Sequence, residues 1–281
     1  LESLVSVTDT GSELYAINQT GSGTLTGKAS SLMEQALEIC RRTDGALDLS
    51  IYPIVRAWGF TTGSYQVPDE AEIQALLPLV DYRKIQYDAA TGTVTVTLPE
   101  GMEIDLGSVA KGYAGQLAAQ MLREHGVQSA LLNLGGNVQT VGTKPDGSPW
   151  QIGIKDPQGE DAMMVLSVED QAVVTSGGYE RYFEQDGQTY WHIMDPSTGH
   201  PADSGLISVT IVGDEGVVCD GLSTALFVMG LEKAADLWAQ SGDFEAVFVT
   251  ASGEVYITEG LRDRFALTEQ YADTPVSVIE R

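Results

Sequence analysis

Apolar residues recur along the chain with a helical period in three long segments. Residues 28–42 carry them three and four positions apart, which is the spacing of one helix face, and Gly45 suits the C-terminal cap. The same spacing predicts a helix over 108–125 and helical structure over 220–240, with a break at Gly230. We therefore expect three long helices, separated by segments of a different pattern.

Between these helices, apolar and polar residues alternate with a period of two, which is typical of half-buried strands. Three hairpins are expected, over 84–98, 182–192 and 246–258, with turns at Thr91-Gly92, Asp186-Gly187 and Ser252-Gly253. Further strands are expected over 130–134 (as a buried strand), 151–154, 163–168, 172–175 and 206–212. Because hairpins dominate and long helices are inserted, the fold class is α+β, with antiparallel or mixed sheets and packed helices. Residues 1–27 are polar and suggest a loop at Gly21-Ser22-Gly23.

Composition narrows the possible partners. The 281 residues include 15 Lys and Arg against 40 Asp and Glu, which gives a formal charge of −25. That balance argues against nucleic acid and against an anionic membrane surface, since both need clustered basic residues. A hydrophobic content of 43% is enough for a core, and no apolar run approaches the ~20 residues that span a bilayer. Any anionic ligand must therefore be bound despite an unfavourable field.

Cysteine and histidine usage excludes several classes of site. Cys40 and Cys219 lie far apart in apolar contexts and are expected to be buried free thiols, without a disulfide framework or a CxxC metal motif. The three histidines, His125, His192 and His200, show no zinc-binding spacing. A structural zinc site and a disulfide scaffold are both excluded.

Two oxygen-bearing residues four positions apart suggest a cation site. Asp220 and Thr224 share one helix face, and carboxylate and hydroxyl oxygens are hard donors suited to Mg²⁺ or Ca²⁺. An alternative is that Asp220 is a helix N-cap stabilised by the macrodipole. A bound cation would also explain how an acidic protein holds a pyrophosphate.

Two further segments carry candidate chemistry. Residues 104–113 place Asp105 and Lys111 at a loop-to-helix junction, where backbone N–H groups can bind phosphate; the alternative is a capped helix with a packing glycine. His192 follows a predicted hairpin strand and precedes a Pro-Ser-Thr-Gly turn. It is either structural or, beside a metal, a group that transfers protons.

Taken together, these segments resemble the ApbE-type FAD:protein FMN transferases. The resemblance extends from about Asp44 to Val249, in matching order and spacing. Its motifs are Asp44-Gly-Ala-Leu-Asp-Leu-Ser50 with Trp58-Gly-Phe60, Ile104-Asp-Leu-Gly107 with Lys111-Gly-Tyr113, Asn133-Leu-Gly-Gly136, Thr175-Ser-Gly177 with Tyr179-Glu-Arg181, His192-Ile-Met-Asp-Pro196, and Asp220-Gly-Leu-Ser-Thr224.

The resemblance implies a Mg²⁺-dependent reaction in which FAD is split, AMP leaves, and FMN becomes phosphoester-linked to a threonine of an acceptor flavoprotein, such as an FMN-binding domain of a redox complex. It also implies the residues that contact FAD. By family position these are Ala46, Leu47 and Asp48 lining the FAD site, Asp105 and Lys111 from the second motif, and Met194 from the histidine-containing turn.

The same resemblance assigns the metal site and the base. Asp220 and Thr224 would ligate Mg²⁺, Ser108 would contribute a backbone carbonyl, and His192 would take the proton of the acceptor threonine. Ser223 stands where some relatives carry Asp, so we do not count it as a side-chain ligand. Two alternatives remain: a Mg²⁺-dependent FAD pyrophosphatase that yields FMN and AMP, and a flavin-binding protein without turnover.

For architecture and location, the resemblance implies one flavin transferase domain over residues 1–281, with a duplicated tunnelling-type fold (T-fold) and FAD in a cleft between two α+β halves. Relatives carry an export signal, often with a lipidated cysteine, followed by a first strand with a flavin-contacting Met. We expect both to be absent from this sequence, and the full-length protein to be extracytoplasmic, at a periplasmic or cell-surface location, and lipid-anchored.

Overall fold

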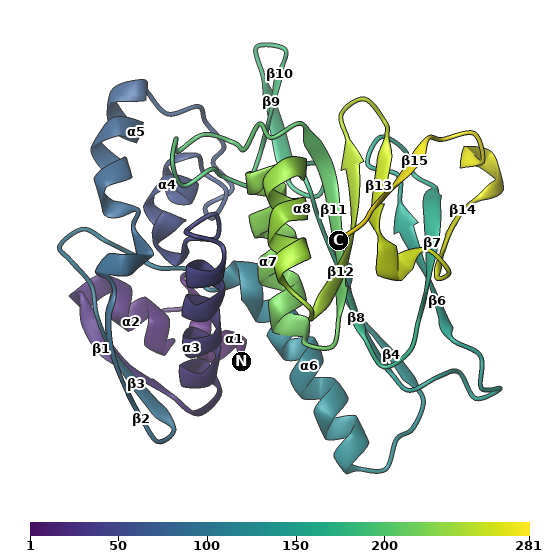
Figure 1. Cartoon of the computed structure of the whole chain (residues 1–281). Coiled ribbons are helices and arrows are strands. Elements are labelled where there is room, and N and C mark those ends of the chain that lie inside the picture. The colour runs from purple at the N-terminus through teal and green to yellow at the C-terminus, as the bar shows by residue number, and fades with distance from the viewer. The chain divides into compact units, whose positions relative to one another are not determined.

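The chain divides into two units, which the computed structural model describes over all residues 1–281 (Figure 1). Unit 1 comprises Leu1–Ala110 and Arg181–Ala202, and unit 2 comprises Lys111–Glu180 and Asp203–Arg281. Each unit is built from helices packed on antiparallel or mixed sheets, so the predicted α+β class is confirmed.

Unit 1 combines five helices with two small sheets. Its first sheet has the strand order β1-β3-β2, and its second is the isolated hairpin of β9 and β10. The helices are α1 (Glu2–Val5), α2 (Glu13–Thr20), α3 (Gly27–Arg42), α4 (Tyr52–Ala57) and α5 (Glu70–Leu76), with 3₁₀ turns at Leu49–Ile51, Leu77–Leu79 and Tyr82–Lys84. The strands are β1 (Ser22–Thr26), β2 (Gln86–Ala90), β3 (Thr93–Thr97), β9 (Tyr182–Gln185) and β10 (Gln188–Trp191).

Two hydrophobic groups stabilise unit 1. Helix α3 buries the stripe that the sequence predicts, including Leu32, Met33 and Leu37, because residues three and four apart share one face. A second cluster surrounds Trp58, which is fully buried and donates its indole N–H to the carbonyl of Gly199 at 2.9 Å. This cluster lies beside the histidine-containing segment 192–200 and therefore supports it.

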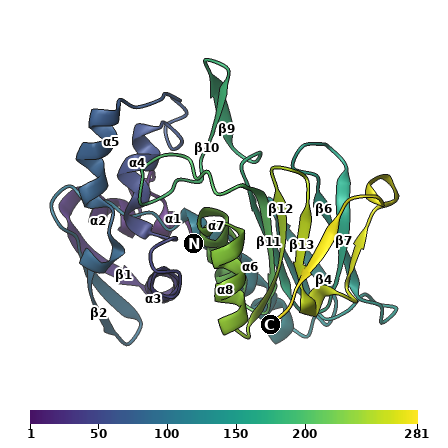
Figure 2. The same ribbon diagram turned by 45° about the horizontal axis from the view of Figure 1, so that its top comes forward.

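Unit 2 is built around a seven-stranded sheet of order β15-β13-β12-β11-β8-β5-β4. Helices α7 and α8 cover one face, and a three-stranded sheet of order β14-β7-β6 packs on the other (Figures 1 and 2). The helices are α6 (Gly107–Glu124), which begins in unit 1, α7 (Gly216–Met229) and α8 (Leu231–Gln240), with 3₁₀ turns at Glu259–Leu261 and Glu269–Tyr271. The strands are β4 (Ala130–Leu134), β5 (Asn137–Val141), β6 (Trp150–Lys155), β7 (Ala162–Val168), β8 (Ala172–Gly177), β11 (Leu206–Gly213), β12 (Phe244–Thr250), β13 (Val255–Thr258), β14 (Phe265–Leu267) and β15 (Val276–Ile279).

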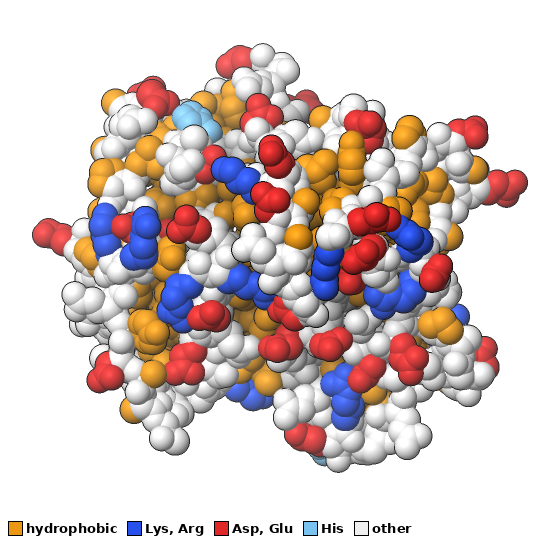
Figure 3. Space-filling model, viewed as in Figure 1, with side chains coloured by type: hydrophobic (Ala, Val, Ile, Leu, Met, Phe, Trp, Pro, Cys, Tyr) orange, Lys and Arg blue, Asp and Glu red, His pale blue; other side chains and the backbone are white.

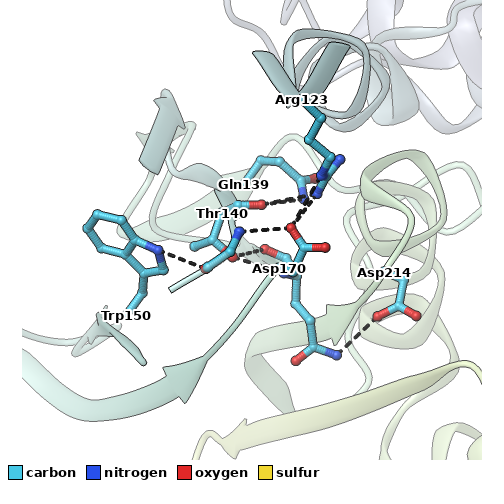
Figure 4. A network of polar contacts seen from close by, with 8 residues as sticks. Arg123, Gln139, Thr140, Trp150, Asp170 and Asp214 are labelled. Atoms are coloured by element: carbon cyan, nitrogen blue, oxygen red, sulfur yellow. Dashed lines mark hydrogen bonds and ion pairs between the residues drawn. The ribbon is translucent and has the colours of Figure 1, made fainter. Parts of the chain in front are cut away.

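A polar network fixes the C-terminal end of α6 to the central sheet (Figure 4). Arg123 donates to Asp170 Oδ1 at 2.7 Å, and the same oxygen accepts the N–H of Gly142 at 2.9 Å. Trp150 donates its indole N–H to the carbonyl of Gly142 at 3.0 Å. Because Arg123 lies on α6, this network holds the unit 2 part of that helix against β5 and β6.

Three predictions about the fold are wrong. Ser22–Thr26 is a strand and not part of a loop, because its backbone pairs with β3. Strand β4 is not buried: it is the edge strand of its sheet, and Leu131 and Leu134 are exposed. Helix α7 begins at Gly216, four residues earlier than predicted, because Val217 and Cys219 continue its buried face.

Both cysteines are buried free thiols, as predicted. Cys40 is 0% exposed and Cys219 is 1% exposed. Burial raises the pKa of the Cys40 thiol to about 12 and raises that of Cys219 further. Neither thiol is ionised at neutral pH.

On the face drawn in Figure 3, Lys and Arg side chains are interspersed with Asp and Glu side chains and are not gathered into one patch. No helix has both the length and the apolar character required to cross a membrane.

Candidate active site

His192 in unit 1 is held by the residue that faces it across the β9–β10 hairpin. The backbone N–H of His192 donates to the carbonyl of Arg181 at 3.1 Å, and Nδ1 lies 3.1 Å from the same oxygen. A carbonyl can only accept, so this contact favours the tautomer with the proton on Nδ1 and the basic lone pair on Nε2. The ring also lies 6.3 Å from that of Phe60. This arrangement suits a general base acting through Nε2.

Arg181 also connects the hairpin to the rest of unit 1. Its guanidinium donates to the carbonyl of Phe60 and stabilises the charged form of Asp105. Burial nevertheless raises the pKa of the Asp105 carboxyl, although the N–H groups of Leu106 and Gly107 lower it. The predicted cofactor residue Asp105 precedes the first residue of α6, Gly107, by two positions. Its Oδ1 accepts the N–H of Gly107 at 2.8 Å.

Asn18, for which the sequence predicts no role, positions the segment before Asp105. Its Nδ2 donates to the carbonyl of Ile104 at 2.8 Å, and its Oδ1 accepts the N–H of Ile104 at 2.9 Å. The two bonds join α2 to a segment 86 residues away. No local pattern in the sequence signals such a pair.

In the predicted FAD loop 46–48, the carboxylate of Asp48 stabilises the chain itself. It accepts the N–H and hydroxyl of Ser50 at 2.8 and 2.6 Å and the N–H of Tyr82 at 2.9 Å. Asp48 is 6% exposed, and burial raises the pKa of its carboxyl. The hydrogen bonds from Ser50 and Tyr82 lower that pKa, but by less. Leu47 is also buried, whereas Ala46 is partly exposed. Contacts of this loop with FAD stay a prediction.

Met194 lies inside the apolar cluster of unit 1. It is 5% exposed and packs with Ile54, Trp58 and Phe60. Its backbone forms an isolated bridge with Pro201, which closes the turn after His192. The structure gives Met194 a packing role, and its predicted contact with the cofactor is untested.

In unit 2, Asp220 lies in the second turn of α7 and is not an N-cap, so the alternative capping role does not apply. Its side chain is buried, and Oδ2 accepts the N–H of Gly112 at 2.8 Å. Burial raises the pKa of the Asp220 carboxyl to about 6, although the N–H of Gly112, the adjacent Asn137 amide and Lys111 all favour the charged form. The buried carboxylate therefore lacks full compensation within the unit.

Thr224 lies one turn after Asp220 on α7, and its hydroxyl contacts that of a serine on a neighbouring strand. Ser176 on β8 lies with its Oγ 3.3 Å from Thr224 Oγ1 and 2.8 Å from Ser223 Oγ. Ser223 donates to the carbonyl of Asp220 at 2.8 Å, so its hydroxyl is used within α7. Ser176 belongs to the Thr175-Ser-Gly177 motif, from which the sequence predicts no role for it.

The donors of unit 2 fit a hard cation. A buried carboxylate and a neighbouring hydroxyl are oxygen ligands, and the amide oxygen of Gln139, also buried, makes no hydrogen bond. No group of three or more His, Cys, Asp or Glu side chains is arranged for a metal. Protein sites for Mg²⁺ often supply only one or two carboxylates and leave the remaining positions to water and substrate phosphates. Asp220 and Thr224 are consistent with such a site.

Gly112 allows α6 to approach the helix that carries these donors. A Cβ added at Gly112 would lie 2.0 Å from the carbonyl oxygen of Gly216 and 2.6 Å from Asp220 Cβ. The N–H of Gly112 reaches Asp220 only because the two helices are this close. The glycine in the 104–113 motif therefore has a packing role as well as a site role.

We expect Gly112→Ala to lower the free energy of unfolding by about 3 kcal/mol or more, because the methyl group would force the two helices apart. Urea unfolding of the purified protein would measure it. Gly115→Ala on the same helix is the matched control, since its Cβ would have only ordinary contacts at 3.6 Å and beyond. It should be neutral or stabilising by up to ~1 kcal/mol. Equal stability of the two variants would contradict the packing role.

The structure thus assigns the predicted site residues to two groups. Unit 1 holds the predicted base His192, one predicted metal ligand, Ser108, and most of the predicted cofactor residues: Ala46, Leu47, Asp48, Asp105 and Met194. Unit 2 holds Lys111, Asp220 and Thr224.

Solved structures of the same fold define the class of the protein. An ApbE protein from Thermotoga maritima superposes with a TM-score of 0.86 at 35% identity, covering 92% of this chain and 85% of that one. The flavin transferase ApbE from Vibrio cholerae gives a TM-score of 0.82 at 28% identity, covering 94% and 86%. The fold is that of a flavin transferase.

Sequence comparisons agree. Curated proteins named FAD:protein FMN transferase from Klebsiella pneumoniae and Treponema pallidum are 40% and 35% identical over 225 and 280 residues. The alignments cover 79% and 94% of this chain, and 69% and 77% of those proteins. The model of the ApbE family matches residues 1–248, and the chain belongs to that family.

Proposed function

We propose that this FAD:protein FMN transferase uses Mg²⁺ to cleave the pyrophosphate of FAD and attaches FMN through a phosphoester to a threonine of an acceptor flavoprotein. The single observation that carries the proposal is His192, whose ring is oriented by the Arg181 carbonyl so that Nε2 is the basic nitrogen. An alcohol nucleophile needs such a base, and the unperturbed pKa of imidazole, ~6.5, suits it. A protein that only binds flavin would not need this arrangement.

The proposed reaction balances as a phosphoryl transfer. The threonine hydroxyl oxygen forms a bond to the phosphorus of the FMN half, while the bond from that phosphorus to the bridging oxygen breaks. The electron pair of that bond leaves with AMP, and His192 accepts the hydroxyl proton at Nε2. His192 then releases this proton to solvent. The orientation of the imidazole lowers the barrier by having the acceptor for the proton in place beforehand.

For the cation, we propose Asp220 and Thr224 as side-chain ligands and the Ser108 carbonyl as a third. Bound Mg²⁺ would neutralise negative charge that develops on the pyrophosphate oxygens. The support from the structure is the buried, incompletely compensated carboxylate of Asp220 and the hydroxyl of Thr224 one turn away. Lys111 would add one positive charge to the phosphate site.

FAD would be held by the residues given by family position, with Ala46, Leu47 and Asp48 in one loop. The Asp48 carboxylate already accepts hydrogen bonds from Ser50 and Tyr82. The groups of this loop that would contact FAD are therefore its backbone and the Ala46 side chain. Asp105 and Met194 complete the predicted set.

An assay with three arms tests the function. Purified protein is incubated with FAD and Mg²⁺, with or without an acceptor flavoprotein domain, while AMP release and in-gel flavin fluorescence are followed. A fluorescent acceptor in the complete mixture alone supports transfer. FMN and AMP formed equally without acceptor would instead establish the pyrophosphatase alternative, and absence of both products would establish a binder.

Removal of divalent cations should weaken FAD binding itself and not only slow the reaction. The reason is the charge balance: with 15 basic residues against 40 acidic ones, a pyrophosphate depends on a cation to be held. We expect the Kd for FAD to rise at least about tenfold in excess EDTA, measured by flavin fluorescence, and to recover on adding Mg²⁺. An unchanged Kd would show that FAD is bound without the cation.

The location of the full-length protein is also proposed, on the family resemblance alone. We propose that it is extracytoplasmic and lipid-anchored, with an acceptor domain of a redox complex on the same side of the membrane. Fractionation of cells that produce the full-length protein would test this, and recovery in the cytoplasm would contradict it.

A further inference from the structure

Strand β5 of unit 2 directs alternate side chains toward different neighbours. Val138 belongs to the apolar cluster between the two sheets of the unit. Because successive side chains of a strand point to opposite faces, Asn137 and Gln139 share the other face. A Cβ added at Gly216, the first residue of α7, would lie 3.1 Å from Gln139 Oε1. This face of β5 therefore meets the helix that carries the proposed cation ligands.

A tight turn fixes Asn137 at the beginning of β5. Leu134 and Asn137 are paired across the β4–β5 hairpin, so the turn consists of Gly135 and Gly136 alone. Both glycines have positive φ, at 60° and 93°, as the type I′ turn of a two-residue hairpin requires. Asn133 Oδ1 accepts the N–H of Gly136 at 2.9 Å and stabilises the turn. The Asn133-Leu-Gly-Gly136 motif therefore sets the position of the residue that follows it.

The side chain of Asn137 is buried beside Asp220. It is 5% exposed, and its Nδ2 makes no hydrogen bond of good geometry. The Asn137 amide nevertheless lies close enough to the Asp220 carboxyl to stabilise its charged form. This position agrees with that of Gln139 beside Gly216, because two residues along a strand and four along a helix both advance about 6–7 Å. A buried donor without a full partner therefore lies next to the proposed cation ligand.

The other groups that hold the Asp220 carboxylate come from α6. Oδ2 accepts the N–H of Gly112 at 2.8 Å, and Lys111 contributes its own N–H and its charge. Asn137 approaches from the sheet instead. Burial of an unpaired donor opposes folding, and an apolar side chain of the same shape would avoid that cost. Donation to the carboxylate is the use that its position gives to this amide.

We infer that Asn137 is a positioning residue for the cation: its amide N–H donates to the Asp220 carboxylate and fixes that ligand in the orientation that Mg²⁺ requires. This inference rests on the proposed function, which places the cation at Asp220. Carboxylates that ligate a metal are themselves hydrogen-bonded, and loss of such a partner weakens metal binding about 10- to 100-fold. Mg²⁺ demands near-ideal octahedral geometry, whereas Ca²⁺ accepts flexible arrangements. A fixed carboxylate therefore favours Mg²⁺ over Ca²⁺.

Asn137→Leu tests the inference, because leucine has the same branched shape but no donor. Mn²⁺, which prefers the same oxygen ligands, is titrated into the purified protein without FAD and followed by its EPR signal. We expect the Kd for Mn²⁺ to rise about 10- to 100-fold, while the metal-free protein keeps its melting temperature. Gln116→Leu is the matched control, since Gln116 Oε1 accepts the N–H of Val217 on α7 at 3.2 Å. It should leave the Kd near the wild-type value.

Competition by Mg²⁺ and by Ca²⁺ against Mn²⁺ separates positioning from general destabilisation. In Asn137→Leu, the ratio of the Kd for Ca²⁺ to the Kd for Mg²⁺ should fall at least about fivefold, because a loosened carboxylate weakens Mg²⁺ binding more. Asn137→Asp adds no bulk and should shift the ratio in the same direction, since it replaces the donor with a further carboxylate. An unchanged ratio in both variants contradicts the inference.

The remaining outcomes distinguish this inference from the proposed function. If the wild type binds no Mn²⁺, or Asp220→Asn binds it as tightly as the wild type, the proposed cation site fails and this inference fails with it. If Asp220→Asn loses the ion but Asn137→Leu keeps the wild-type Kd, only this inference is overturned. Equal weakening in Gln116→Leu would also overturn it, because any lost contact with α7 would then have the same effect.

Discussion

Replacing His192 with alanine is expected to lower the rate of FMN transfer by about 10²- to 10⁴-fold, the usual effect of losing a general base. The reason is geometric, since the Arg181 carbonyl fixes the ring through Nδ1 and so places the lone pair on Nε2. Binding of FAD should change little. Single-turnover labelling of an acceptor domain measures the rate, and flavin fluorescence measures the binding.

A second substitution separates chemistry from structure. His192→Asn keeps a side-chain N–H near the Nδ1 position, so the contact with Arg181 can persist, but it has no basic nitrogen. It should be as slow as the alanine variant and melt at the wild-type temperature. The control is His200→Ala, because His200 is a partly exposed histidine of the same unit that contacts Glu70. A rapid His192→Asn enzyme would contradict the base assignment.

Asp220→Asn is expected to lower the transfer rate by about 10²- to 10³-fold, which corresponds to several kcal/mol of lost charge stabilisation. Without metal, however, the variant should be more stable than the wild type. Burial raises the pKa of Asp220 from 3.8 to about 6, so its charged form opposes folding at pH 7 by roughly 2–3 kcal/mol. Asparagine removes that charge and can still accept the N–H of Gly112.

Thermal unfolding with and without Mg²⁺ measures both the stability of the metal-free protein and its stabilisation by the cation. The wild type should gain melting temperature when Mg²⁺ is added, whereas Asp220→Asn should start higher and gain little. Asp236→Asn on the exposed face of α8 is the control for loss of a charge in the same unit. If Asp220→Asn kept the response of the wild type to Mg²⁺, Asp220 would not be a ligand.

The periodic segments made the elements predictable. Helix α3 and the hairpins β2–β3, β9–β10 and β12–β13 follow the sequence pattern closely, because their faces are set by residues near in the chain. The edge position of β4 was not predictable, since the order of strands in a sheet depends on contacts between distant segments. Strand β1 was missed for the same reason: its partner β3 lies about seventy residues away.

The sequence predicts the types of residue in the candidate site, but it predicts few of the contacts that hold those residues in position. The motifs indicate His192, Asp220 and Thr224, because the type and spacing of these residues point to a base and to cation ligands. Their supports are backbone groups or residues from other segments, such as the Arg181 carbonyl and the N–H of Gly112. A backbone group has no signature in the sequence, so these contacts could be found only in three dimensions.

The burial of both cysteines makes the native protein effectively thiol-free toward alkylating reagents. A maleimide dye reacts with the thiolate, and neither Cys40 nor Cys219 offers one at neutral pH. A cysteine introduced at exposed Gln188 in unit 1 and another at exposed Lys233 in unit 2 would therefore be labelled without background. Energy transfer between the two dyes would follow the separation of the units as FAD, Mg²⁺ and acceptor are added, in a protein that keeps all its native residues at the active site.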